Sequence, residues 1–446
     1  MNVSMIGLAV WLTAIELPVG TSFQYSGTLS QQTKSGEIEV KSLTLDAVVV
    51  TAENGSTQLA FLIEERGGGA WAWPERFGLL PLSAEAASAN SSIRILYHHD
   101  DQQYPLPIRS PFFEFSDKLA LQSSWTDGRR EYVVTRKRNL KNRDGLQVEV
   151  STNSGKSQTL VVETGSGILL SLDEKIVVGR GDELRLKMEL SSQSQLSPAD
   201  LARYQPAMDS LLALRSELGR TGEQKLVELT ADQMKLVQKE LPRIEKQAEG
   251  TPWSRLVATI SRDLKQQQKR LDGVAGLQKL LVGHPAPDWS LKSVDDRVLS
   301  SSETKGKVVV LHFWQYRGET LVEPYGQIGY LDFLNNKRKK LGVKVIGINV
   351  DDRFAGSEQK GAAMRSMKKL IEFMNVGYEM AIDDGSALIG FGDPRTSGAP
   401  LPLWIVIGHD GNVSHCHTGL YDIKPDEGLK QLDDAIIDAL RKQNAR

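Results

Sequence analysis

Hydrophobic and polar residues alternate along the first part of the chain, from about Ser22 to Leu190, in a pattern that is typical of β-strands. Short apolar runs such as Leu43–Val50 and Leu59–Ile63 are separated by polar residues and turn formers. In the second half of this region, from LQVEVS to ELRLKMEL, the alternation predicts a meander with one face in contact with solvent. The residues expected to point into its core include Leu184, Leu186, Met188 and Leu190.

An aromatic cluster interrupts this β-rich region at WAWPERFG, which contains Trp71, Trp73 and Phe77. Aromatic side chains supply much of the apolar area of a core, so we expect this cluster to be buried rather than to form an exposed aromatic site. The pattern permits either one continuous sheet or two sub-domains between residues 21 and 192.

The pattern changes to helical spacing between residues 195 and 281. Ser197 precedes a first-turn proline, and the segment Thr230–Gln233 fits a capping box. Apolar residues then recur three or four positions apart, as in Leu256, Ile260 and Leu264. Amphipathic helices usually pack on their own chain, so a helical spacer is favoured over a partner-binding arm or a dimerising hairpin.

A third style of sequence begins at Gly283, where VGHPAP breaks the helical pattern. Strands and helices alternate from there to the C-terminus. The continuous apolar runs Val308–Phe313 and Val343–Val350 suit strands in the middle of a sheet that is covered on both faces. We therefore predict an α/β domain over residues 283–446.

The apolar run Val3–Ile15 has the length of a signal peptide and is too short to span a bilayer as a helix. No lysine or arginine occurs before Lys34, so the usual positive region is missing. We expect residues 1–20 to be a signal segment and the protein to be secreted or in the cell envelope, with a buried first strand as the alternative. No later stretch is long and apolar enough to be a membrane span.

The composition of the chain excludes several classes of function and site. With 446 residues, 40% hydrophobic residues, 25% charged residues and a net charge of −2, the chain suits a multidomain globular protein and has no basic surplus for nucleic-acid binding. Its single cysteine, Cys416, excludes an intramolecular disulfide and a cysteine-rich zinc site.

Four stretches of the third region occur in a specific order: GHPAPDWSL, LSSSETKGKVVVLHFW, LGVKVIGINVDD and PLPLWIVIGHDGNV. From about Gly283 to the C-terminus the chain resembles the secreted and membrane-tethered thiol-disulfide oxidoreductases of the TlpA and ResA type. These belong to the redoxin branch of the thioredoxin superfamily. The resemblance implies a thioredoxin-like fold and places the functional site after the strand that ends at Phe313 and Trp314.

In that family the strand is followed by Trp-Cys-x-x-Cys, whereas this chain has FWQYRGETLVEP. With one missing residue, Arg317 and Thr320 occupy the cysteine positions; without the gap, Gly318 and Leu321 do. Neither alignment supplies sulfur. Thiol-disulfide exchange needs an attacking thiolate and a resolving thiol, so we predict that this site has no catalytic residues and no redox turnover of its own.

The resemblance also implies a cis-proline loop facing the motif, and Pro402 matches it better than Pro400. In the family, the residue before that proline, here Leu401, offers its backbone to an extended substrate by strand addition, which needs no cysteine. The start of the following helix, with Arg317 beside it, could hold an anion or a carboxylate. The predicted binding residues are Trp314, Arg317, Gly318, Thr320, Leu401 and Pro402.

Other residues that could act as a nucleophile, a metal ligand or a binding patch are explained more simply by structural roles. Cys416 lies in a late strand and is expected to be a small core residue. His415 and His417 would share a face of that strand, but two imidazoles without a third ligand do not make a metal site, and none is predicted. The basic run Lys337–Lys340 fits the solvated end of a helix.

These observations predict a multidomain α+β protein with an antiparallel β-rich region (21–192), a helical segment (195–281) and a thioredoxin-like α/β domain (283–446). We expect it to bind proteins or peptides in an extended conformation, without a cofactor, a nucleic acid or an integral membrane span. Two alternatives remain: a thiol-disulfide oxidoreductase acting with a partner's cysteines, and a structural envelope protein.

Overall fold

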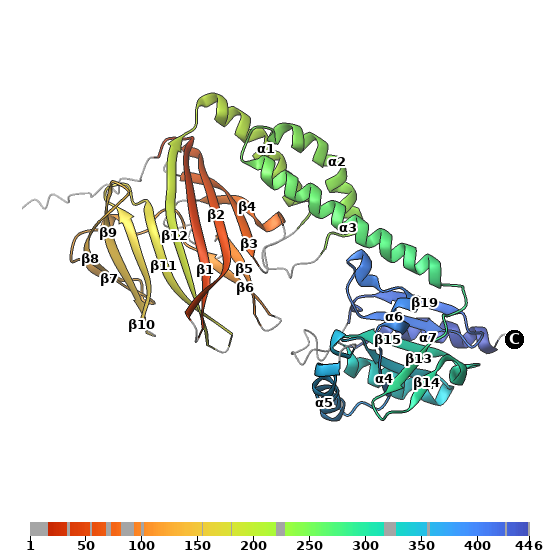
Figure 1. Cartoon of the computed structure of the whole chain (residues 1–446). Coiled ribbons are helices and arrows are strands. Elements are labelled where there is room, and N and C mark those ends of the chain that lie inside the picture. Colours follow the sequence, from red (N-terminus) through yellow and green to blue (C-terminus); the bar gives the residue numbers. More distant parts are fainter. Residues whose placement is uncertain are drawn as a thin grey trace, which may run out of the picture. The chain divides into compact units, whose positions relative to one another are not determined.

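The computed structural model describes residues 17–33, 36–53, 56–67, 73–81, 93–99, 102–153, 155–179, 181–219, 228–315, 327–354, 357–423 and 426–444. The chain divides into two compact units, the first ending at Arg262 and the second beginning at Asp263 (Figure 1). The antiparallel sheet, the helical segment and the α/β C-terminal part confirm the predicted fold class. Within the described residues, no helix combines the length and the apolar character needed to cross a membrane.

The first unit is built on an antiparallel sheet whose ten described strands lie in the order β4-β3-β2-β1-β12-β11-β10-β9-β8-β7 (Figure 1). A separate pair, β5 and β6, forms its own two-stranded sheet. The strands are β1 (Thr21–Thr33), β2 (Gly36–Glu53), β3 (Ser56–Gly67), β4 (Phe77–Pro81), β5 (Ile93–His99), β6 (Gln102–Ile108), β7 (Ser124–Thr126), β8 (Glu131–Leu140), β9 (Arg143–Thr152), β10 (Gly155–Glu163), β11 (Leu169–Val178) and β12 (Asp182–Gln195).

One face of this sheet carries the core of the unit. Alternate residues of each strand point into it, because successive side chains of a strand lie on opposite faces. The pair β5 and β6 contributes Ile95 and Leu106 to the same core. The four residues predicted to point inward from β12 are buried members of this cluster: Leu184, Leu186, Met188 and Leu190.

A buried ion pair lies among these apolar side chains. The side chains of Lys41 of β2 and Glu65 of β3 are both 0% exposed, and Lys41 Nζ donates to Glu65 Oε2 over 2.6 Å. Burial raises the pKa of Glu65, and Lys41 counteracts this shift. Taking two charges out of water costs free energy, and their mutual attraction offsets this cost. Loss of either partner would therefore leave an uncompensated charge in the core and destabilise the protein.

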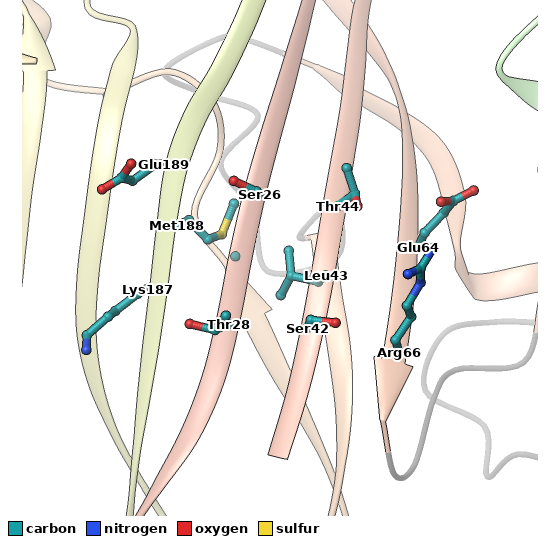
Figure 2. A pocket seen from close by; sticks show the side chains of 11 residues that line it. Ser26, Thr28, Ser42, Leu43, Thr44, Glu64, Arg66, Lys187, Met188 and Glu189 are labelled. Carbon is teal, nitrogen blue, oxygen red and sulfur yellow. The ribbon is translucent and has the colours of Figure 1, made fainter. Parts of the chain in front are cut away.

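The opposite face of the sheet is polar where β3, β2, β1 and β12 lie side by side (Figure 2). Strand register brings small hydroxyl residues together in the middle of this area and charged residues to its two sides. They enclose a shallow hollow of about 530 Å³.

Three helices follow the sheet: α1 (Pro198–Glu217), α2 (Ala231–Ala248) and α3 (Trp253–Leu281). The Ser197 side chain accepts a hydrogen bond from the Asp200 N–H group, and Thr230 and Gln233 form a capping box, as the sequence predicts. Within the first unit, Trp253 packs edge-on against Phe77, with ring centroids 6.1 Å apart. Trp73 and Phe77 are buried core residues, as expected; Trp71 lies outside the described residues.

The second unit contains a mixed sheet of seven described strands in the order β14-β13-β17-β16-β15-β18-β19. The strands β15, β16 and β17 are parallel to one another, β18 is antiparallel to β15, and β19 is antiparallel to β18. They span β13 (Ser290–Ser293), β14 (Val298–Ser300), β15 (Val309–Trp314), β16 (Lys344–Asn349), β17 (Glu379–Ile382), β18 (Leu403–Ile407) and β19 (Val413–Thr418).

Helices cover both faces of this sheet. One face packs against α4 (Ile328–Arg338), α5 (Ser357–Met374) and α7 (Lys430–Asn444), which contribute Leu331, Met367 and Ile436 to the core. The other face packs against α6 (Ser386–Phe391) and the last turns of α3, through residues such as Phe391 and Leu281. Every residue of β15 is buried as a result.

His312, in the middle of β15, is a polar exception in this core. Its side chain is 0% exposed and stacks on Trp404, with ring centroids 3.8 Å apart. Neither ring nitrogen has a hydrogen-bond partner among the described residues. Desolvation lowers the pKa of His312 to about 3, so the ring is neutral at any physiological pH.

We expect His312→Phe to stabilise the protein more at pH 5 than at pH 7.5. An unfolded chain protonates this histidine below about pH 6.5, whereas the folded chain does not until about pH 3. Stability is therefore lost as the pH falls from 6.5 toward 3, by about 1.4 kcal/mol per pH unit. Phenylalanine removes this loss, a difference of about 2 kcal/mol between the two pH values in urea unfolding. Equal gains at both would contradict the assignment; the exposed His284→Phe is the control.

The buried ion pair gives a second prediction. Glu65→Leu leaves the Lys41 ammonium buried without its carboxylate, so the free energy of unfolding should fall by about 3 to 5 kcal/mol. The double variant Lys41→Met/Glu65→Leu should recover most of that loss, because no buried charge remains.

Urea denaturation of the full chain measures both effects. The solvent-exposed pair of Lys187 and Glu37 is the control, in which Glu37→Leu should cost much less stability than Glu65→Leu does. A double variant as unstable as Glu65→Leu alone would show that the pair acts through packing rather than charge.

Candidate functional site

The candidate site lies at the carboxyl edge of the parallel strands in the second unit. The strands β15 and β16 end there at Trp314 and Asn349, which are paired in register. The neighbouring strand β18 starts at the same edge, because Leu403 pairs with Phe313. Side chains in mid-strand are covered on both faces, so accessible groups collect where the strands end.

The structure describes three of the six predicted binding residues. Trp314 is buried at 4% exposure, Leu401 is half-buried and Pro402 is buried, and strand pairing brings all three to this edge. The other three, Arg317, Gly318 and Thr320, lie outside the described residues, as does Leu321. Their roles stay predictions.

The loop before β18 has the backbone geometry that the resemblance implies. The Leu401–Pro402 peptide bond is cis. The Pro402 carbonyl accepts a hydrogen bond from the Gly419 N–H group over 2.8 Å. In contrast, neither the N–H nor the C=O group of Leu401 makes a hydrogen bond to any residue that the structure describes. This backbone is therefore available to an incoming strand.

The loop that follows β19 is fixed next to Leu401. Trp404 Nε1 donates to the Gly419 carbonyl over 2.9 Å. The Gln327 side chain, at the start of α4, bonds both backbone groups of Tyr421, at 2.6 Å and 3.1 Å. Leu420 lies between these two fixed residues and is 43% exposed, so its backbone is held in place while an apolar side chain remains exposed.

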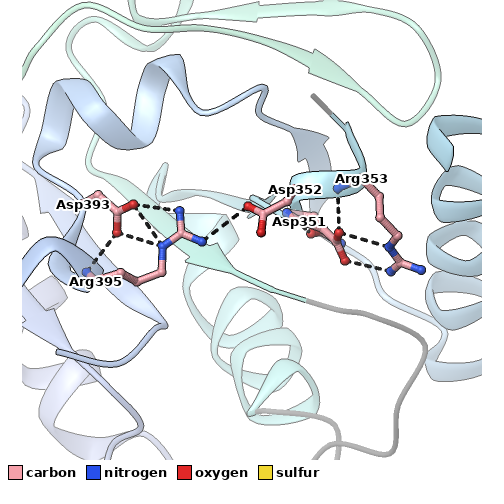
Figure 3. Close-up of polar contacts among 6 residues, drawn as sticks. Asp351, Asp352, Arg353, Asp393 and Arg395 are labelled. Atoms are coloured by element: carbon pink, nitrogen blue, oxygen red, sulfur yellow. Dashed lines mark hydrogen bonds and ion pairs between the residues drawn. The ribbon is translucent and has the colours of Figure 1, made fainter. Parts of the chain in front are cut away.

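Charged residues flank the same edge (Figure 3). Arg353 folds back on Asp351, with Nη2 and Oδ2 2.7 Å apart. Arg395 bonds Asp393 at 2.7 Å and reaches Asp352 at 3.7 Å. The Arg395–Asp352 contact joins the turn after β16 to the loop before β18, although such an exposed ion pair contributes little stability.

Burial opposes the ionisation of Asp393. Hydrogen bonds from Arg395 outweigh that effect and hold the pKa of Asp393 below its usual range. The same hydrogen bond raises the pKa of Arg395. Both groups are therefore charged at neutral pH, and each neutralises the other. The sequence analysis missed the charged residues at this edge. For Asp351, Asp352 and Arg353 a signal existed, because polar residues directly follow a buried strand in NVDDR.

Cys416 lies away from this edge, in the interior of β19. It is 3% exposed, pairs with Ile405 of β18 and has its carbonyl bonded by Gln278 of α3. Burial raises the pKa of its thiol to about 12, so almost no thiolate exists at neutral pH. The interpretation of Cys416 as a core residue is confirmed.

His415 and His417 point to one face of β19, as expected, and both contact Tyr421. His415 Nε2 is 2.9 Å from the Tyr421 hydroxyl, and the His417 ring stacks on the tyrosine with centroids 4.1 Å apart. Burial lowers the pKa of both histidines. Among the described residues, no three His, Cys, Asp or Glu side chains are arranged to hold a metal ion.

The C-terminal part of the chain is similar to known proteins. Residues 282–416 match the AhpC/TSA family. ResA, a thiol-disulfide oxidoreductase of Bacillus cereus, is 26% identical over 139 residues, which are 31% of this chain and 70% of ResA. ResA of Bacillus thuringiensis is 25% identical over 160 residues, which are 36% of this chain and 79% of the relative.

Solved structures similar to the chain include a thiol:disulfide interchange protein of the thioredoxin family from Chlorobium tepidum, at 21% identity and a TM-score of 0.28, covering 35% of this chain and 95% of that one. A DsbF homologue from Corynebacterium diphtheriae has 16% identity and a TM-score of 0.28, covering 34% and 85%. From the family match and the ResA relatives, the C-terminal domain of this chain resembles the thioredoxin-like redoxins of the ResA type, and its sequence lacks the Cys-x-x-Cys pair.

Proposed function

We propose that the C-terminal domain binds protein or peptide segments in an extended conformation, by strand addition at Leu401, and does not turn over disulfides. The observation that carries this proposal is that the backbone of the half-buried Leu401 makes no hydrogen bond to any residue that the structure describes. An extended segment placed there would satisfy both polar groups, as in other cases of strand addition. Main-chain hydrogen bonds would supply affinity without requiring any particular ligand side chain.

The state of the thiol supports binding without redox turnover. Exchange needs a thiolate, and the pKa of Cys416 near 12 keeps that group protonated. A second thiol to resolve a mixed disulfide is missing from the sequence. Any disulfide chemistry at this domain would therefore depend on cysteines that a partner brings.

The rigid surroundings of Leu401 support the same function. Gly419 and Tyr421 are held by hydrogen bonds to Pro402, Trp404 and Gln327, so the backbone on both sides of Leu420 is fixed. An apolar side chain of the ligand could pack on it at little entropic cost. Trp314 and Pro402 complete the described part of the proposed groove; Arg317, Gly318 and Thr320 are assigned to it from the sequence alone.

We further propose that the protein acts outside the cytoplasm, secreted or in the cell envelope. The support is the apolar run Val3–Ile15, which has signal-peptide length. In this proposal, residues 283–446 form the domain that binds the extended segment. Residues 21–192 and 195–281 form separate regions that do not take part in this binding.

The strand-addition proposal predicts a specific effect of Leu401→Pro. Proline removes the N–H donor, so affinity for an unfolded probe protein, carboxymethylated α-lactalbumin, should fall about tenfold, the cost of one lost interfacial hydrogen bond and its unpaired partner. Fluorescence anisotropy of the labelled probe measures this.

Leu401→Ala is the matched control, because alanine keeps both backbone groups. Circular dichroism establishes that each variant is folded. A folded Leu401→Pro protein with unchanged affinity would refute strand addition at this position.

The absence of turnover is tested by insulin reduction with dithiothreitol as donor. We expect the full chain to leave the rate equal to that of dithiothreitol alone. A Cys416→Ser variant should behave in the same way, since the thiol is buried and protonated. Acceleration by the wild type that disappears in Cys416→Ser would instead favour the oxidoreductase alternative.

A further inference from the structure

We propose that the hollow on the polar face of the first unit's sheet binds a neutral oligosaccharide. It lies across β12, β1, β2 and β3, far along the chain from the redoxin domain, and is bounded by two parallel rows of side chains (Figure 2). Its volume of about 530 Å³ is within the range of small-molecule sites. The proposal is independent of the proposed function of the second unit.

Strand register builds the two rows. In one row, Glu189, Ser26, Thr44 and Glu64 are consecutive cross-strand neighbours. In the other row, Lys187, Thr28, Ser42 and Arg66 are. Each row therefore has two short hydroxyl side chains in the middle and two long charged ones at its ends. The difference in length between them creates the hollow.

The floor between the rows is peptide backbone. Met188, Gly27 and Leu43 lie there, and the side chains of Met188 and Leu43 belong to the core on the other face. Gly27 is required, because a Cβ at this position would lie 2.8 Å from Met188 Cγ and 2.9 Å from the Lys187 carbonyl. A flat floor and polar walls suit a ligand that lies along the sheet surface.

Three of the charged side chains at the ends of the rows form ion pairs with residues outside the hollow. Arg255 of α3 bonds Glu64 at 3.2 Å, Glu37 bonds Lys187 at 3.2 Å, and Lys141 lies 3.6 Å from Glu189. The hydroxyls of Thr28, Ser42 and Thr44 and the Arg66 guanidinium make no hydrogen bond to a described residue. The ion pairs direct the charged side chains at the ends of the rows, and the hydroxyls of Thr28, Ser42 and Thr44 are available to a ligand.

Charge selects among ligand classes. Two carboxylates in one row oppose two cations in the other, so the hollow has no net charge and disfavours a simple anion or cation. Strand addition is excluded, since β1 and β2 are paired on both sides. Hydroxyl groups both donate and accept hydrogen bonds, and so do the hydroxyls of a sugar. Four strands span about 14 Å, which matches a linear saccharide of about three rings.

Isothermal titration calorimetry of the full chain with cellotriose, maltotriose and tri-N-acetylchitotriose tests this. At least one should bind. Thr28→Val and Thr44→Val keep the side-chain shape and should each weaken binding about fivefold, because each removes one hydrogen bond. Arg185→Gln is the control: Arg185 lies on the same face of β12, two residues from Lys187, but is outside the hollow and pairs with Asp173.

The proposal is overturned if none of the trisaccharides binds at millimolar concentration to a protein with an intact unfolding transition. It is also overturned if Arg185→Gln weakens binding as much as the threonine variants do. Sulfate and a Gly-Ser pentapeptide are the comparison ligands, and binding of either one without a trisaccharide would assign the hollow to a different class of ligand.

Discussion

The burial of β15 and β16 on both faces is the constraint on which the second unit depends. Because helices cover the sheet on either side, no residue in mid-strand can reach a ligand, and accessible groups are confined to the carboxyl edge. The same burial sets the chemistry of the residues inside. Burial keeps the His312 ring of β15 neutral, and burial in the same sheet keeps the Cys416 thiol of β19 protonated, so neither group is charged at neutral pH.

Much of this architecture could be predicted from local patterns. Alternation predicted the inward residues of β12, and the hydroxyl caps predicted the starts of α1 and α2, because these signals depend only on neighbours in the chain. The cis peptide bond at Pro402 followed from the resemblance and not from any physical rule that could separate Pro402 from Pro400.

The polar features that depend on register were not predicted. Lys41 and Glu65 are 24 residues apart in sequence, and their pairing exists only because β2 and β3 align in one particular register. Arg395 and Asp352 meet because two strands end at one edge. The hollow on the first unit is the extreme case: its eight wall residues come from four strands and form two rows only after the sheet is assembled.

The position of helix α3 determines where a fragment that contains the C-terminal domain has to begin. The AhpC/TSA family match begins at residue 282, but the last turns of α3 already belong to the second unit. Leu281 is buried in its core, and Gln278 bonds the Cys416 carbonyl. Gly273 and Ser397 are also in close contact, next to the loop that leads to Pro402. A fragment starting at Gly283 would expose apolar surface and lose this support, so an autonomous domain has to retain the helix from Asp263 onward.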